Sequence, residues 1–144
     1  MKQVSFHYTQ DSYKDGSKNV TRRLTWGVKP GEHFRGVKQM QGLKKGEHRT
    51  LLGESICVSV TLERLDEIIK HPIRRIEIIN NTSLNILDPD VMNTRTEMDR
   101  EGVPAYTPEQ YVTLFKRINK RAGVELNNDT IIKRVVFRRA RGKW

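Results

Sequence analysis

The chain has almost no cysteine and no long apolar run. Cys57 is the only cysteine among 144 residues, which excludes an internal disulfide and a cysteine-based zinc site. No apolar run approaches the roughly 18 residues that a membrane span needs, and the N-terminal letters MKQVSFHYTQ lack the apolar core of a signal peptide. The four histidines are scattered without metal-ligand spacing. We therefore expect a cytoplasmic protein with no membrane contact, no metal and no cofactor.

Acidic residues are also scarce, and the imbalance of charge is uneven along the chain. There are 27 Lys and Arg against 17 Asp and Glu, a formal net charge of +10. Residues 14–49 carry a net charge of +7, residues 50–111 carry −5, and residues 112–144 carry +8. If the two basic stretches meet in the fold, they make one positive face that attracts phosphate groups. This pattern predicts RNA or a nucleotide as partner, although a basic surface that serves only solubility gives the same counts.

Short alternating runs and frequent turn residues predict a fold rich in strands. Along Ser55 to Leu62, the apolar residues at 56, 58, 60 and 62 predict one buried face, and Cys57 falls on the other. Further strands are expected near residues 3–8, 21–26, 33–37, 73–79 and 131–137. Pro30 and Gly31 suit a type II turn. Several short strands with few helices predict an α+β class, a small barrel or strongly bent sheet with short helices packed on it.

One helix has a clear start signal in the sequence. Thr107 can cap it, Pro108 suits its first position, and Gln110 completes a capping box. Apolar residues at 111, 112, 114, 115 and 118 form a stripe to be buried, and Gly123 is the expected stop. Shorter helices are expected at residues 9–15, ended by Gly16, at residues 65–69, and from position 94 or 96 to 101.

Four motifs in order resemble the ASCH family. The letters GSKNVTRR at residues 16–23 resemble its G-x-K-x-x-T-x-R motif, and VKPGE at 28–32 its K-P-G-D turn. The letters REGVP at 100–104, followed by TPEQYV at 107–112, are similar to its E-G-[FV]-x and T-P-x-E-[FY] segments. Residues 131–137 match the closing strand, and GLKKGE at 42–47 looks like a form found in small bacterial and bacteriophage members.

The resemblance covers about residues 18–137 and implies a PUA-like β-barrel, and we expect residues 1–144 to form one such domain. It also implies a cleft at the barrel mouth, lined by the K-x-x-T-x-R loop and the glutamate helix, and a link to RNA or nucleoside binding. Small members of the family remove acyl groups from N4-acylated cytosine nucleosides with a Lys, a Thr and a Glu. By motif position these are Lys18, Thr21 and Glu101, with Arg23 beside them. Residues 70–97 are extra to the usual barrel, and residues 138–144 form a basic tail.

The residue types are compatible with this chemistry. A Thr hydroxyl needs a base nearby, and Lys18 serves only if its pKa falls from about 10.4, which burial and neighbouring arginines favour and Glu101 opposes. Glu101 would pass a proton to the leaving amine, and Arg23 or backbone N–H groups would stabilise the oxyanion. The alternative is ordinary: a strand threonine, a solvated loop lysine and a glutamate that closes a short helix.

Three hypotheses follow. The first is an ASCH-type module that binds RNA or a modified nucleotide, the second is an amidohydrolase acting on N4-acylcytidine-type nucleosides, and the third is a phage-encoded protein acting on a host factor through the extra segment. Candidate contacts to the ligand or nucleic acid are Arg22, Arg23, Lys44, Lys45, Tyr106, Arg138, Arg139 and Arg141. The sequence leaves the oligomeric state, the ligand and the host open.

Overall fold

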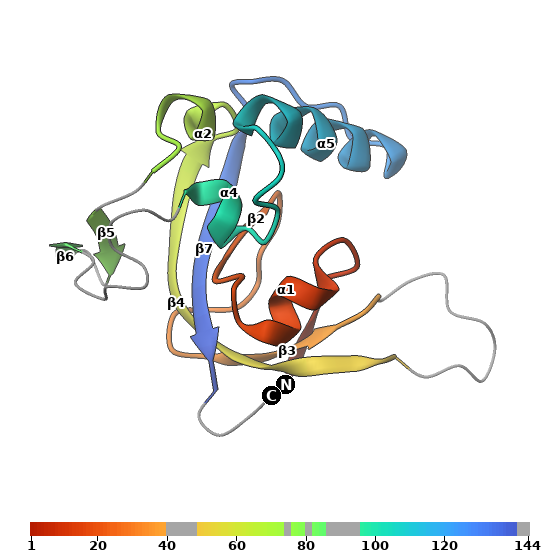
Figure 1. Ribbon diagram of the computed structural model, residues 1–144, viewed down its shortest axis with the longest axis vertical. Helices are drawn as coiled ribbons and strands as arrows, with labels where there is room; N and C mark the ends of the chain where they lie inside the picture. The colour runs from red at the N-terminus through yellow and green to blue at the C-terminus, as the bar shows by residue number, and fades with distance from the viewer. Residues whose placement is uncertain (40–48, 74–75, 80–81, 86–95, 141–144) are drawn as a thin grey trace.

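The computed structural model describes residues 1–39, 49–73, 76–79, 82–85 and 96–140 of the chain. A strongly curled sheet forms its body, and helices lie on the concave side and at one end (Figure 1). The strands are β1 (Lys2–Ser5), β2 (Val20–Arg23), β3 (His33–Val37), β4 (Leu51–Arg64), β5 (Ile76–Ile79), β6 (Thr82–Asn85) and β7 (Ile131–Arg139). The helices are α1 (Gln10–Asp15), α2 (Glu67–Lys70), α4 (Glu97–Arg100) and α5 (Pro108–Arg121). The expected α+β class is confirmed at this level.

Five strands form the main sheet in the order β1-β3-β4-β7-β2. β1 pairs with β3 in parallel, and the other neighbours are antiparallel. β4 is the long central strand, and it bends from the end near α2 to the end below α1 (Figure 1). The two edge strands approach one another, because the Arg23 Nη2 atom on β2 donates to the Ser5 backbone oxygen on β1 at 2.6 Å. The sheet is therefore a half-barrel whose open side is bridged by a side chain.

Two apolar clusters fill the described part of the molecule. The first lies inside the curl and is rich in stacked aromatic rings, such as Phe6 on Tyr13 at 4.1 Å between centroids. The second lies under α5, where Tyr111, Val112 and Phe115 of that helix pack with α2 and α4. The expected stripe of the long helix is confirmed, and so is its capping box. The site described below lies between these clusters.

The buried face of β4 differs from the expected one. Cys57 is 1% exposed and belongs to the aromatic cluster, against which the partly buried Val60 of the expected face also packs. The reason is a bulge: Cys57 pairs with Phe137 and Ser59 with Val136, so residue 58 is skipped in the ladder. One extra residue reverses the side on which later side chains point. Periodicity alone cannot locate such a bulge, and the prediction that Cys57 lies off the apolar face was wrong.

Gly36 in β3 lies flat against the ring of Tyr13, and a Cβ atom at this position would overlap that ring. The Tyr13 hydroxyl is fixed by a 2.8 Å hydrogen bond to Ser55 Oγ, so the ring cannot swing away. We expect Gly36→Ala to lower the free energy of unfolding by about 1–3 kcal/mol, as overpacking does. Gly27→Ala is the control, because its added Cβ would meet only the flexible Lys2 Nζ at 3.7 Å. Urea denaturation of both variants measures this, and equal stabilities would contradict it.

The extra segment contains a small second sheet, the hairpin of β5 and β6, which lies beside the half-barrel (Figure 1). Residues 74–75, 80–81 and 86–95 of that segment lie outside the described residues. In the described part of the chain, no helix is long and apolar enough to cross a membrane.

Candidate functional site

A cavity of about 420 Å³ lies where the N-terminal loop, β2 and α5 meet. One end is polar and the walls are largely apolar. Four parts of the chain line it: residues 5–9, residues 18 and 21–25, residues 101 and 103, and residues 111, 114, 115, 118 and 119 of α5. Lys18, Thr21, Arg23 and Glu101 all belong to this lining. The structure therefore brings together the four residues that the ASCH resemblance selects.

Lys18 is buried at the polar end of the cavity, with 4% of its surface exposed. Backbone bonds from Lys18 N to Ser12 O at 3.0 Å and from Asn19 N to Arg100 O at 2.9 Å fix its loop between α1 and α4. The Lys18 Nζ atom donates to the Glu101 backbone oxygen at 2.6 Å and to Glu101 Oε1 at 3.1 Å. Burial lowers the pKa of Lys18 to about 8, although the Glu101 carboxylate opposes this.

Thr21 and Arg23 face the cavity from β2, as the two-residue period of a strand requires. The Thr21 Oγ1 atom accepts a hydrogen bond from Arg23 Nε at 3.0 Å, and its own proton remains available to a base. The Arg23 guanidinium also lies 5.2 Å from the centroid of the Phe6 ring. Burial lowers the pKa of Arg23 from its ordinary value, and Arg23 remains a cation at neutral pH.

Glu101 follows α4, and the start of that helix is well defined. The Thr96 side chain accepts from Asp99 N at 3.1 Å, which confirms one of the two starts expected from the sequence. Glu101 is 2% exposed, and its second oxygen, Oε2, accepts from Arg22 Nη1 at 3.0 Å. Both carboxylate oxygens thus face cations, Lys18 on one side and Arg22 on the other.

Tyr111 is a cavity residue that sequence reasoning placed only in the buried stripe of the helix. It is 8% exposed and lines the cavity from α5. Burial and the nearby Glu101 carboxylate raise its pKa well above the ordinary 10.0, so its hydroxyl keeps its proton and can donate a hydrogen bond. A tyrosine in a helical stripe carries no local signal of this role.

Of the other predicted contact residues, Arg22 also belongs to the cavity lining, and the rest lie elsewhere or outside the described residues. Arg22 is buried, and its guanidinium donates to carboxylates. Tyr106 is 39% exposed between α4 and α5, and Arg138 and Arg139 are exposed at the far end of β7. Lys44, Lys45 and Arg141 fall on residues that the structure does not describe.

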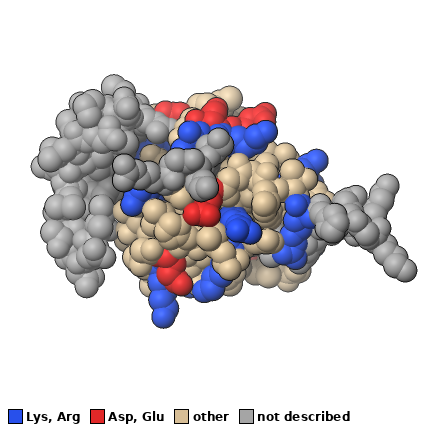
Figure 2. Space-filling view, turned by 90° about the horizontal axis from the view of Figure 1, so that it is seen from below, with Lys and Arg blue, Asp and Glu red and all other residues tan. Residues whose placement is uncertain are grey.

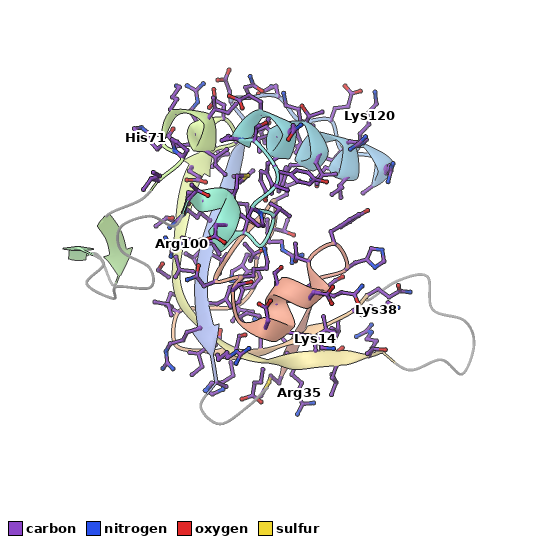
Figure 3. All side chains as sticks on the ribbon, in the orientation of Figure 1. Lys14, Arg35, Lys38, His71, Arg100 and Lys120 are labelled. Atoms are coloured by element: carbon purple, nitrogen blue, oxygen red, sulfur yellow. The ribbon has the colours of Figure 1, made fainter. Side chains whose placement is uncertain are left out.

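The basic side chains of the described residues are spread over the surface. On the lower face, Lys and Arg alternate with acidic and neutral surface and no single basic patch stands out among the coloured residues (Figure 2). Lys120 on α5 and Arg35 beneath the sheet lie at opposite ends of the molecule, and Arg100 points inward near α4 (Figure 3). Within the described ranges, no cluster of three His, Cys, Asp or Glu side chains could hold a metal ion.

Comparison with known proteins gives no family for the chain: it matches no protein-family model, and no curated protein or solved structure is significantly similar to it.

Proposed function

We propose that this protein is an ASCH-type, PUA-like domain that binds a nucleoside unit, free or within RNA, in the cavity beside β2. The observation that carries the proposal is the meeting of Lys18, Thr21, Arg23 and Glu101 at one end of a single cavity. Lys18 and Glu101 are 83 positions apart in the chain, and nothing in the composition favours their contact. The curled five-stranded sheet supports the barrel-like part of the proposal.

The cavity has the size and lining that a nucleoside requires. Small-molecule sites generally span about 300–1,000 Å³, with apolar walls and a few convergent polar groups. Here Phe6, Tyr8 and Phe115 offer aromatic surface for a base, while the polar end offers donors for its carbonyl oxygen. The Lys18 ammonium has a third N–H beyond the two that Glu101 accepts. A pyrimidine carbonyl is the complementary acceptor.

Calorimetric titration with cytidine and N4-acetylcytidine tests this binding. We expect both the acylated and the plain nucleoside to bind, and Thr21→Val to weaken binding about tenfold, as loss of one buried hydrogen bond does. Thr113→Val is the matched control, because Thr113 is exposed on α5. If neither nucleoside binds, but single-stranded RNA binds with a steep salt dependence, the exposed arginines and not the cavity form the nucleic-acid site.

An amidohydrolase acting on N4-acylcytidine-type nucleosides is the second candidate. Its specific support is that the buried Lys18, with a pKa of about 8, lines the same cavity as the Thr21 hydroxyl. Neutral Lys18 would take the Thr21 proton while Oγ1 bonds to the acyl carbon, and Arg23 would stabilise the oxyanion. The C–N bond then breaks as the proton passes by way of Glu101 to the leaving N4 amine. Water finally hydrolyses the acyl-threonine ester and restores the hydroxyl.

A further inference from the structure

Arg22 belongs to the cavity lining, and its guanidinium contacts three carboxylates. Its side chain is 0% exposed. Arg22 Nε donates to Glu63 Oε1 at 2.7 Å, Nη2 to Glu97 Oε1 at 2.6 Å, and Nη1 to Glu101 Oε2 at 3.0 Å. These carboxylates come from β4, from the first residue of α4 and from the residue after α4. The planar, forked guanidinium can satisfy all three at once, which a lysine ammonium on a shorter reach cannot.

The two α4 carboxylates are spaced so that one arginine can hold both. Glu97 and Glu101 are four positions apart and therefore lie on the same face of the helical turn. Arg22 connects this face to β2. Because Thr21 lies next to Arg22 on β2, the orientation of Glu101 is fixed relative to Thr21. Glu97 is itself held by Arg134 of β7, through bonds of 2.6 and 3.2 Å. The clamp is thus anchored to the centre of the sheet.

We propose that Arg22 is a positioning residue for the cavity: it clamps Glu101 toward Lys18 and remains the counter-ion of Glu101 when Lys18 loses its proton. The physical need is clear, because a buried carboxylate without a cation is costly. If Lys18 were the sole partner of Glu101, deprotonation of Lys18 would leave such a carboxylate. With Arg22 on Oε2, the carboxylate stays paired in both states of Lys18. The positioning role rests on the proposed function, but the experiment that tests it requires no ligand.

Several charged or titratable groups lie around Lys18 in the cavity. Glu101 raises its pKa, whereas Arg22 and Arg23 from β2 lower it. Tyr111 from α5 and His7 from the N-terminal loop line the same cavity. Arg22 donates to the Glu101 oxygen that Lys18 does not contact, and Tyr111 also hydrogen-bonds to the Glu101 side chain. Replacing Arg22 by lysine keeps its charge and removes the fork, which separates positioning from simple charge repulsion.

The test is the pKa of Lys18 in Arg22→Lys, measured by NMR titration of its side-chain Cε and Nζ resonances in the full chain. We expect the pKa to rise by about one unit, because Glu101 loses the hydrogen bond from Arg22 Nη1 and depends more on Lys18. Arg134→Lys is the matched control: the same change in the same network, at a residue that donates twice to Glu97. Its Lys18 pKa should stay within about 0.3 unit of the unsubstituted value.

An unchanged Lys18 pKa in folded Arg22→Lys, or an equal rise in both variants, would overturn the proposal. Glu63→Gln covers the case in which Arg22→Lys does not fold, since Glu63 lies at the edge of the network and its side chain is 6% exposed. The glutamine oxygen still accepts from Arg22 Nε. Because the Glu63 charge is gone, the ion pair between Arg22 and Glu101 becomes stronger. The Lys18 pKa should then fall, and a constant or higher value would also refute the clamp. Because no nucleoside enters these titrations, their failure is separate from a failure of nucleoside binding.

Discussion

Glu97→Ala is expected to cost about 3–5 kcal/mol of the free energy of unfolding, which is the usual effect of breaking a buried ion pair. Glu97 is 0% exposed and accepts from Arg22 and Arg134, both at 2.6 Å, with Arg100 3.5 Å away. Its removal leaves arginines buried at the centre of the sheet with one carboxylate fewer. Urea denaturation at pH 7 measures the loss.

The control for this change is Glu125→Ala, at a glutamate whose side chain is 85% exposed and whose ion pair with Lys120 is 3.9 Å long. Exposed substitutions of this kind stay within about 0.5 kcal/mol. A loss below about 1 kcal/mol for Glu97→Ala would mean that the arginines find other partners or water when the carboxylate is removed.

The same carboxylate gives a pH dependence with a definite sign. Burial alone would raise the pKa of Glu97, but the charges of Arg134 and Arg22 outweigh it and hold the pKa well below the ordinary 4.5. A folded-state pKa below the unfolded one means that the stabilisation is complete above about pH 4.5 and is lost as the pH falls. The difference in free energy of unfolding between the unsubstituted protein and Glu97→Ala should therefore decrease as the pH is lowered from 5 to 2.

Local signals in the sequence predict the helices well. The capping box at Thr107, the cap at Thr96 and the stop at Gly16, whose φ is 84°, are all present in the structure. The turn at Pro30 and Gly31 is also present, with Glu32 N bonded to Lys29 O at 3.0 Å. Each of these caps and turns is determined by residues within a few positions of one another, so a local pattern in the sequence is sufficient to predict it.

Features that depend on contacts between distant parts of the chain could not be predicted from the sequence pattern. The bulge in β4 puts Cys57 on the face opposite to the expected one. The bulge itself depends on the pairing of β4 with β7, where Cys57 meets a residue 80 positions later. Glu97 and Arg134 look like ordinary surface charges in the sequence, yet they form the buried centre of the molecule. The meeting of Lys18 with Glu101 was expected only from the ASCH resemblance, since neither spacing nor periodicity relates a loop to a helix end that far away.

Thr21→Val is expected to abolish the hydrolysis of N4-acetylcytidine, by about a thousandfold or more, if the amidohydrolase reading holds. Valine keeps the shape of threonine, so the loss reports the hydroxyl that would attack the acyl carbon. Lys18→Met should cost a similar factor by removing the base, and the double variant should be no worse than either single one, because the two groups act in one step. Release of cytidine, followed by liquid chromatography, measures the rate. Thr113→Val and Lys14→Met, both at exposed positions, are the matched controls and should keep full activity.

The pH profile of that reaction decides whether Lys18 is the base. Only the neutral amine can accept the Thr21 proton, so kcat/KM should rise with pH and level off above about pH 8, the pKa to which burial lowers Lys18. A lysine at its ordinary pKa of about 10.4 would give a rate that is still rising at pH 9. Turnover with a plateau near pH 8 that survives in Lys18→Met would assign the base to another group. Binding without turnover at any pH would leave the cavity as a recognition site alone, because its Thr21 hydroxyl would then serve as a hydrogen-bond partner and not as a nucleophile.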